Sequence, residues 1–123
     1  MGNFRKLEVW QLAMDLAVFI YKITDSGKFS RDYDLRSQIR KASVSIPSNI
    51  SEGDESGSNK QSIRYFNIAK GSSAEVQTQA IIAFEIGYIS QEENSEIISR
   101  CEIISKKLVN LIKFRSKNLK PAT

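Results

Sequence analysis

The chain has 123 residues, 41% of them hydrophobic and 26% charged, which suits one globular domain with a substantial core. It contains no histidine and a single cysteine, so His-based general-base catalysis, most zinc sites and an internal disulfide are excluded. The net charge of +4 is too small to establish a partner by itself. No apolar run approaches the ~20 residues that a membrane span needs, and the first residues lack the apolar core of a signal peptide. We therefore expect a cytoplasmic protein without a membrane partner.

The first helix is predicted at about residues 6–24. Apolar residues recur there at helical spacing, and the predicted inward stripe is Leu7, Trp10, Met14, Ala17 and Tyr21. The sequence Asp25-Ser26-Gly27 is typical of a turn in which glycine adopts a positive φ angle, so we expect the helix to end there.

The second helix is predicted to start at Asp32 or Asp34, because acids suit a helix N-terminus, and to end near Glu55. Its inward stripe is Leu35, Ile39, Ala42, Ile46 and Ile50. The same segment contains Pro47 and several serines, which are poor residues for a helix interior. A helix that keeps its apolar stripe through them must be held by tertiary packing.

The third helix is predicted at about residues 60–89. Its inward positions are Phe66, Ala69, Ser73, Val76, Ala80, Ala83 and Gly87. Further apolar side chains lie around the rest of the circumference, and a helix that is apolar on two sides usually has two partners. We interpret Ile82, Phe84 and Ile86 as an oligomer interface. A broad core face is the alternative.

The fourth helix is predicted at about residues 92–114, with acids at its start and lysines at its end, as the helix dipole favours. Its inward stripe is Ile97, Cys101, Ile104, Leu108 and Leu111. Cys101 is therefore expected to be a buried small hydrophobe and not a nucleophile. Four helices with short connectors predict an all-α, up-down-up-down antiparallel four-helix bundle over residues 1–116, followed by a basic, frayed tail at 117–123.

Four blocks of the sequence also carry a family resemblance. In chain order they read FRKLEVWQLAMDLAVFIY, LRSQIRKASVSIPSNISEG, RYFNIAKGSSAEVQTQ and IAFEIGYIS. Together they resemble the bacterial four-helix-bundle proteins encoded in 23S rRNA intervening sequences, often labelled as a ribosomal-protein family. Ser51 and Lys41 are departures, since the family usually has alanine and arginine there. The signature residues are Gln38, Ser45, Pro47, Ser48, Asn49, Glu52, Gly53 and Gly71.

The resemblance implies a bundle that assembles as a ring, a homopentamer with a central channel. It also implies a relationship to the accessory variability proteins of diversity-generating retroelements, which are basic pentameric bundles that bind nucleic acid and a reverse transcriptase. The family's own biochemical role is poorly defined, and the resemblance supplies no catalytic residue.

Basic residues gather on the predicted helices, and no acid follows Glu102. Such side chains neutralise phosphates without reading bases. The candidate nucleic-acid-binding residues are Arg36, Arg40, Lys41, Arg64, Lys70, Lys106, Lys107, Lys113, Arg115 and Lys117. The alternative is that they are solvated or pair with Asp32, Asp34, Glu52 and Glu75. For Arg40, inside the signature, we favour a structural or inter-subunit ion pair.

The polar side of the signature does not indicate an enzyme. Ser45, Ser48, Asn49 and Glu52 offer no activated base beside a serine, and no oxyanion loop is visible in the sequence. We expect these groups to satisfy the backbone around Pro47 and to bond to the third helix or a neighbouring subunit. The three acids Glu52, Asp54 and Glu55 do not converge as calcium ligands do, and we interpret them as a solvated helix end.

The sequence thus predicts a non-enzymatic, oligomeric four-helix bundle, with no metal or cofactor, that binds nucleic acid, with RNA favoured. The alternative is a protein–protein adaptor or scaffold ring that docks a partner polypeptide through the surplus apolar face of the third helix.

Overall fold

The structure, a computed structural model, describes residues 3–119, which contain helices and no strand. After a short 3-10 helix η1 (Phe4–Lys6) come α1 (Glu8–Ile23), α2 (Gly27–Arg31), α3 (Tyr33–Glu55), α4 (Asn59–Glu85) and α5 (Gln91–Lys117). The predicted all-α architecture is confirmed, with α1, α3, α4 and α5 as its four long helices.

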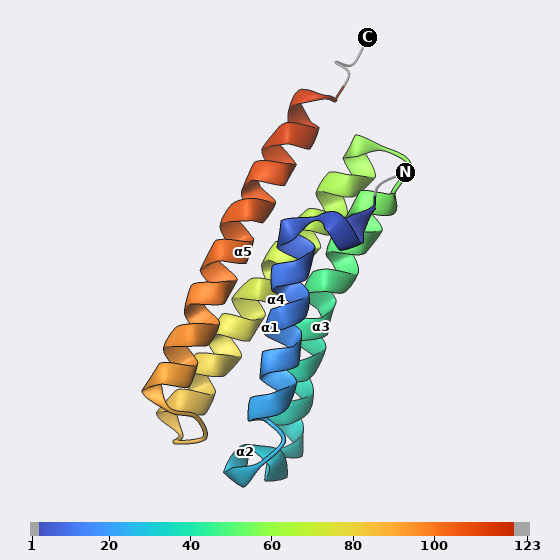
Figure 1. Cartoon of the computed structure of the whole chain (residues 1–123). Helices are drawn as coiled ribbons and strands as arrows, with labels where there is room; N and C mark the ends of the chain where they lie inside the picture. The colour runs from blue at the N-terminus through green and yellow to red at the C-terminus, as the bar shows by residue number, and fades with distance from the viewer. Residues whose placement is uncertain (1–2, 120–123) are drawn as a thin grey trace.

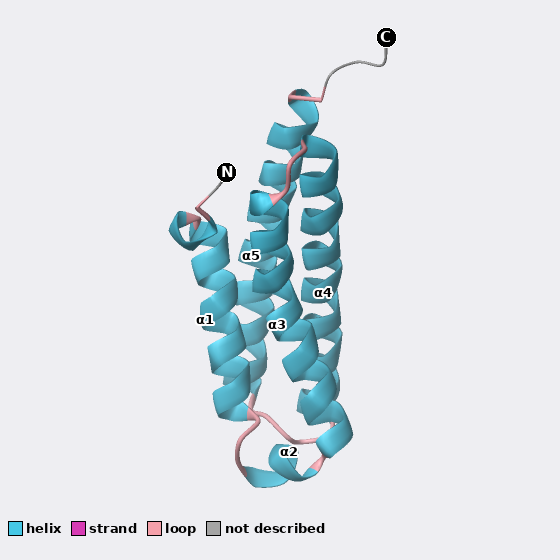
Figure 2. Cartoon of the chain, turned by 90° about the vertical axis from the view of Figure 1, so that its right-hand side faces the viewer, coloured by secondary structure: helices cyan, strands magenta, loops and turns pink. Residues whose placement is uncertain are grey.

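The four long helices run alternately up and down and form one bundle (Figure 1). Each packs against two neighbours, since α3 contacts α1 and α4, while α5 contacts α4 and α1. The helices α1 and α4 therefore lie diagonally opposite one another, with α1 at one side and α4 at the other in Figure 2. The starts of α1 and α4 and the ends of α3 and α5 share one end of the bundle.

The inward stripe of α1 differs from the prediction. Its buried residues are Val9, Ala13, Leu16, Ala17 and Ile20. Of the predicted stripe only Ala17 is buried, while Met14 and Tyr21 are exposed. Both stripes have helical spacing, and the sequence does not say which one meets α3 and α5. The second stripe is left on the outside of the bundle.

The segment predicted as a turn also contains α2, whose Phe29 is 1% exposed and closes one end of the core. Its ring lies 5.4 Å from that of Tyr88, in the turn after α4. A five-residue helix is too short to produce a periodic signal. Gly27 has φ +66°, as the turn prediction requires.

The helix α4 ends four residues earlier than predicted, and Gly87 lies in the turn and not in the core. The N–H of Tyr88 donates to the Ala83 carbonyl at 2.8 Å, and the N–H of Gly87 donates to the Phe84 carbonyl at 3.0 Å. This pattern, with Gly87 at φ +83°, is a Schellman termination. The other predicted inward residues of α4 are buried.

The helix α5 begins with a capping box between Ser90 and Glu93. The predicted inward residues Ile97, Cys101, Ile104 and Leu108 are buried, and Leu111 is partly buried. Lys117 still belongs to α5, so the predicted tail starts slightly later than expected, and residues 120–123 lie outside the described residues.

Asp32 caps the N-terminus of α3 and ties it to the opposite turn. Its carboxylate accepts bonds from the Leu35 N–H at 3.1 Å and from the Tyr88 hydroxyl at 2.9 Å. The Leu35 bond, followed by the Tyr88 bond, lowers the pKa of Asp32, and the same contact raises the pKa of Tyr88. The carboxylate form is therefore the stabilising one.

This cap predicts a loss of stability in acid. Because the pKa of Asp32 is lowered on folding, its contribution is present above the unfolded value and disappears as the pH falls through the folded value. Asp32→Asn keeps a capping oxygen and removes the charge, so its melting temperature should fall less steeply than that of the parent between about pH 5 and pH 2. Melting curves at several pH values check this, with Asp34→Asn as the control. Equal slopes for Asp32→Asn and the parent would contradict it.

Candidate nucleic-acid interface

The polar signature residues on α3 connect it to α4. The hydroxyls of Ser45 and Ser72 lie 2.8 Å apart, and the Asn49 amide donates to the Ser45 carbonyl at 2.8 Å and to its hydroxyl at 3.0 Å. The hydroxyl contact of Asn49 completes a small network between the two helices. The structure gives the predicted bond to the third long helix. The described side chains place no donor on the Ser43 carbonyl, which Pro47 leaves without its helical partner, so that part of the prediction is not realised.

Two signature residues, Gln38 and Ser45, line a hollow of about 310 Å³ between α3 and α4, together with Lys41, Ala42, Ser72, Glu75 and Gln79. Ser48 and Glu52 are exposed on α3. Nothing in this arrangement places a base beside a serine hydroxyl.

The sequence interpretation, in which Gly53 and Gly57 end the second predicted helix, is wrong for Gly53. It lies inside α3, where an added Cβ would stand 2.6 Å from Cε1 of Phe66 on α4. The glycine permits α3 and α4 to approach closely over this ring; it does not end the helix. Gly71, by contrast, is exposed on α4 with open space around it.

Asp54 is buried, so the prediction of a solvated helix end is wrong for this acid, whereas Glu52 and Glu55 are exposed as predicted. The Asp54 carboxylate, with a side chain 8% exposed, lies 3.6 Å from the Arg115 guanidinium of α5. Arg115 also donates to Asn59 at 3.2 Å and to Ser62 at 3.3 Å. Its guanidinium lies 5.9 Å from the centre of the Phe66 ring. These contacts hold α3, α4 and α5 together at one end of the bundle.

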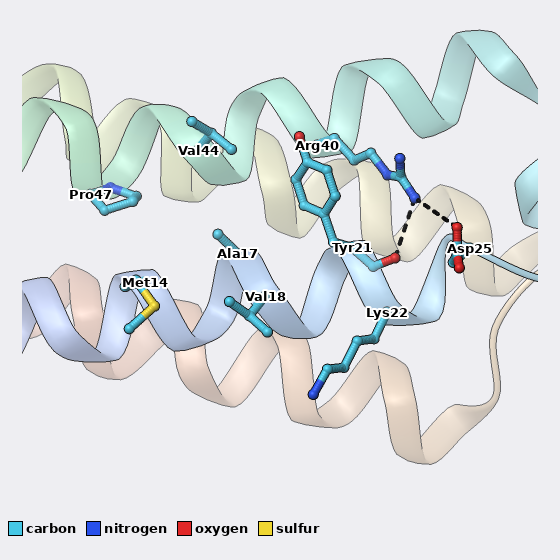
Figure 3. Close-up of a pocket in the computed structure, with 9 residues that line it drawn as sticks. All are labelled: Met14, Ala17, Val18, Tyr21, Lys22, Asp25, Arg40, Val44 and Pro47. Carbon is cyan, nitrogen blue, oxygen red and sulfur yellow. Dashed lines mark hydrogen bonds and ion pairs between the residues drawn. The ribbon is translucent and has the colours of Figure 1, made fainter.

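Arg40 connects α3 to the end of α1. Its guanidinium donates to the Thr24 hydroxyl at 2.8 Å and to the Tyr21 carbonyl at 3.3 Å, and it lies 3.8 Å from the Asp25 carboxylate. Figure 3 shows this contact beside the Tyr21 ring, whose centre is 4.4 Å away. The structure thus places Arg40 in the structural pair that we favoured.

Two further candidates have partners within the chain. Arg36 donates to the Ser30 carbonyl at 2.7 Å and covers the Tyr33 ring. Lys107 forms an ion pair with Glu8 of α1. Because each of these side chains already has a partner within the chain, neither is fully available to an external phosphate.

The other six candidates are exposed and form no ion pair with the described residues: Lys41, Arg64, Lys70, Lys106, Lys113 and Lys117. Three of these lie on α5 and fall within about 40° of one another around the helix axis. We call Lys106, Lys113 and Lys117 the α5 lysine face. No acid occurs among the described residues after Glu102, so Lys113 and Lys117 have no acidic neighbour on their own helix, while Lys106 lies one turn after the exposed Glu102.

The described residues give little support to a catalytic function. Cys101 is buried, and desolvation raises the pKa of its thiol to about 11, so it is protonated at neutral pH and a poor nucleophile. In residues 3–119, no three His, Cys, Asp or Glu side chains gather as metal ligands. No helix in the same range combines the length and apolar character that crossing a bilayer requires.

The three apolar residues predicted at an oligomer interface divide into two groups. Ile82 is 45% exposed and Ile86 is 51% exposed, both at the C-terminal end of α4. Phe84 is partly buried and packs against the core of its own subunit. The exposed candidates are therefore the two isoleucines.

These features define a small helical-bundle protein with a lysine face on its last helix and a polar network between the signature residues of α3 and Ser72 of α4. Residues 5–110 match the family described as 23S rRNA-intervening sequence protein, and the chain belongs to that family. A crystal structure of a protein of unknown function from the S23 ribosomal protein family of Bacteroides thetaiotaomicron is similar to it, with a TM-score of 0.78 and 26% identity. The similarity covers 85% of this chain and 98% of that one. No curated protein matches the chain.

Proposed function

We propose that this protein is a non-enzymatic, homo-oligomeric, nucleic-acid-binding protein of the cytoplasm, with RNA as the favoured ligand. The α5 lysine face is the observation that carries the proposal. Three unpaired ammonium groups along one helix face match the regular charge of a phosphate backbone, and they offer no means of reading bases. The proposed assembly is a ring, and a ring of five subunits is what the family resemblance implies.

The position of this face favours a ligand that lies along the bundle. Lys113 and Lys117 lie towards the end of α5, where the Asn59 amide of α4 donates to the Asn118 carbonyl at 3.3 Å. Arg64 follows one turn later on α4 and is also exposed. Cations of two adjacent helices thus border the same end of the molecule, and repetition around a ring would multiply their field.

Removing two of these charges tests the proposal. The variant Lys106→Gln/Lys113→Gln should bind a labelled structured RNA more weakly, and the slope of log affinity against log salt should fall by about 1 for each lysine that contacts phosphate. The matched control is Lys28→Gln/Arg31→Gln, which removes the same charge from the opposite end of the bundle. Fluorescence anisotropy across a salt series measures both. An equal effect of the two variants would show non-specific attraction and contradict the assignment.

A protein–protein adaptor is the second candidate, and one observation favours it. An exposed apolar groove lies between α1 and α3, where a partner helix fits. Binding of a polypeptide there would depend little on salt, whereas binding of RNA to the lysine face should depend on it steeply. The salt series therefore distinguishes the two candidates.

A further inference from the structure

The groove between α1 and α3 is apolar and open to solvent (Figure 3). It has a volume of about 600 Å³. The helix α1 contributes Met14, Ala17, Val18 and Tyr21, and α3 contributes Val44 and Pro47. Met14 is 37% exposed, and Val18, Tyr21 and Val44 are 42–44% exposed. These residues include Met14 and Tyr21 of the second apolar stripe of α1, which the packing of their own subunit leaves exposed.

The groove is held in shape by the contacts around Arg40. This residue, at one end of the groove, bonds to the Tyr21 carbonyl and to Thr24, and its guanidinium lies over the Tyr21 ring. The wall formed by Tyr21 is therefore fixed to α3. A pre-shaped apolar groove binds a helix at a smaller entropic cost than a mobile surface does.

A second unpartnered apolar surface lies on the diagonally opposite helix. Ile81, Ile82 and Ile86 are 45%, 45% and 51% exposed at the C-terminal end of α4, and the exposed Glu85 lies among them. We call these four residues the α4 ridge. At about 100° per residue, Ile81, Ile82 and Glu85 point away from the buried face of α4. The ridge is convex and carries a negative charge, whereas the groove is concave.

The groove lining carries Lys22 beside the paired Arg40 and Asp25, so its net charge is positive and opposite in sign to that of the ridge. Lys22 borders the groove, and in Figure 3 its side chain extends along the outer side of α1, away from α3. Neither Lys22 nor Glu85 forms an ion pair with another described residue. A ridge seated in the groove would bring Glu85 towards a cation and its isoleucines against Met14, Val18 and Val44.

We propose that the α1–α3 groove of one copy receives the α4 ridge of a second copy. This inference rests on the homo-oligomer of the proposed function and adds the surfaces that form it. Groove and ridge are different surfaces of one chain, so the contact is head-to-tail. Each end of an open assembly then has one free groove or one free ridge, so the contact does not stop at a two-fold dimer, and it forms a ring when the rotation between neighbours closes.

Complementary variants test this pairing. Val44→Glu places a charge in the groove and leaves the ridge intact, and Ile82→Glu does the reverse. Each variant alone should have the mass of one 13.9 kDa chain by light scattering coupled to size exclusion. An equimolar mixture should form a dimer and nothing larger, because one intact groove and one intact ridge remain in it. Ile103→Glu alters an isoleucine that is 47% exposed outside both surfaces and should keep the parent's mass.

The possible results distinguish the groove–ridge pairing from the homo-oligomer on which it rests. A parent protein that is itself a monomer would overturn the oligomer and the pairing together. An oligomeric parent whose Val44→Glu and Ile82→Glu variants also stay oligomeric would overturn the pairing alone. Two monomeric variants whose mixture remains monomeric would exclude the head-to-tail contact. Circular dichroism of each variant identifies any loss of mass that comes from unfolding.

Discussion

Arg115→Met is expected to lower the free energy of unfolding by roughly 3 kcal/mol, since it leaves the buried Asp54 carboxylate without its cation. The pair lies 3.6 Å apart, with Asp54 only 8% exposed on its side chain. The substitution also removes the bonds of Arg115 to Asn59 and Ser62, and methionine keeps most of its apolar stem. Urea unfolding at fixed protein concentration measures the loss.

Two further variants distinguish the loss of the ion pair from the loss of side-chain packing as the cause of the lower stability. Lys113→Met changes an exposed cation of the same helix and should alter stability by less than about 0.5 kcal/mol. The double variant Arg115→Met/Asp54→Leu removes both charges and should recover part of the loss, because an unpaired buried charge costs more than an absent pair. A double variant that is no more stable than Arg115→Met would contradict this explanation.

Gly53→Ala is the second substitution with a large expected effect. Its Cβ would stand 2.6 Å and 2.9 Å from two carbons of the Phe66 ring, which is fully buried and has little room to move. Overpacking of this kind costs about 1–3 kcal/mol, of which the better helix propensity of alanine recovers at most about 1 kcal/mol. We expect a net loss near the upper part of that range and a lower midpoint in urea.

A glycine of the same family signature supplies the control. Gly71 is also inside a helix but has open space around it, so Gly71→Ala should raise stability by about 0.5–1 kcal/mol. Gly53→Ala/Phe66→Leu should lose less than the sum of its two single variants, because the smaller side chain relieves the overlap. Additive losses would show that Gly53 does not act through Phe66.

The stripes of α3 and α5 could be predicted because each helix has one strong apolar register. The helix α1 has two, and the structure buries the one with Leu16 and Ile20 while it exposes Met14 and Tyr21. Only the position of the neighbouring helices decides between such registers. The helix α2 was missed because five residues carry no periodicity, although its Phe29 closes the core.

The basic residues show how much of a binding site can be predicted from composition. Their presence on the predicted helices was clear, but not which of them have partners. Arg40 and Arg115 pair with Asp25 and Asp54, which are distant in the sequence, and such pairs depend on the packing of three helices. Arginine forms several directed bonds at once, which suits both junctions. Residue type alone does not identify the paired cations, because Arg64 is exposed and Lys107 pairs with Glu8.

Sedimentation velocity of the parent protein with a fluorescently labelled structured RNA, at low and at high salt, tests the proposed function most directly. The proposal predicts that at low salt the label sediments with an oligomer of the 13.9 kDa chain, and that raising the salt releases the RNA while the oligomer persists. RNA that sediments alone at every salt concentration, beside an intact oligomer, would contradict the nucleic-acid function and favour the adaptor.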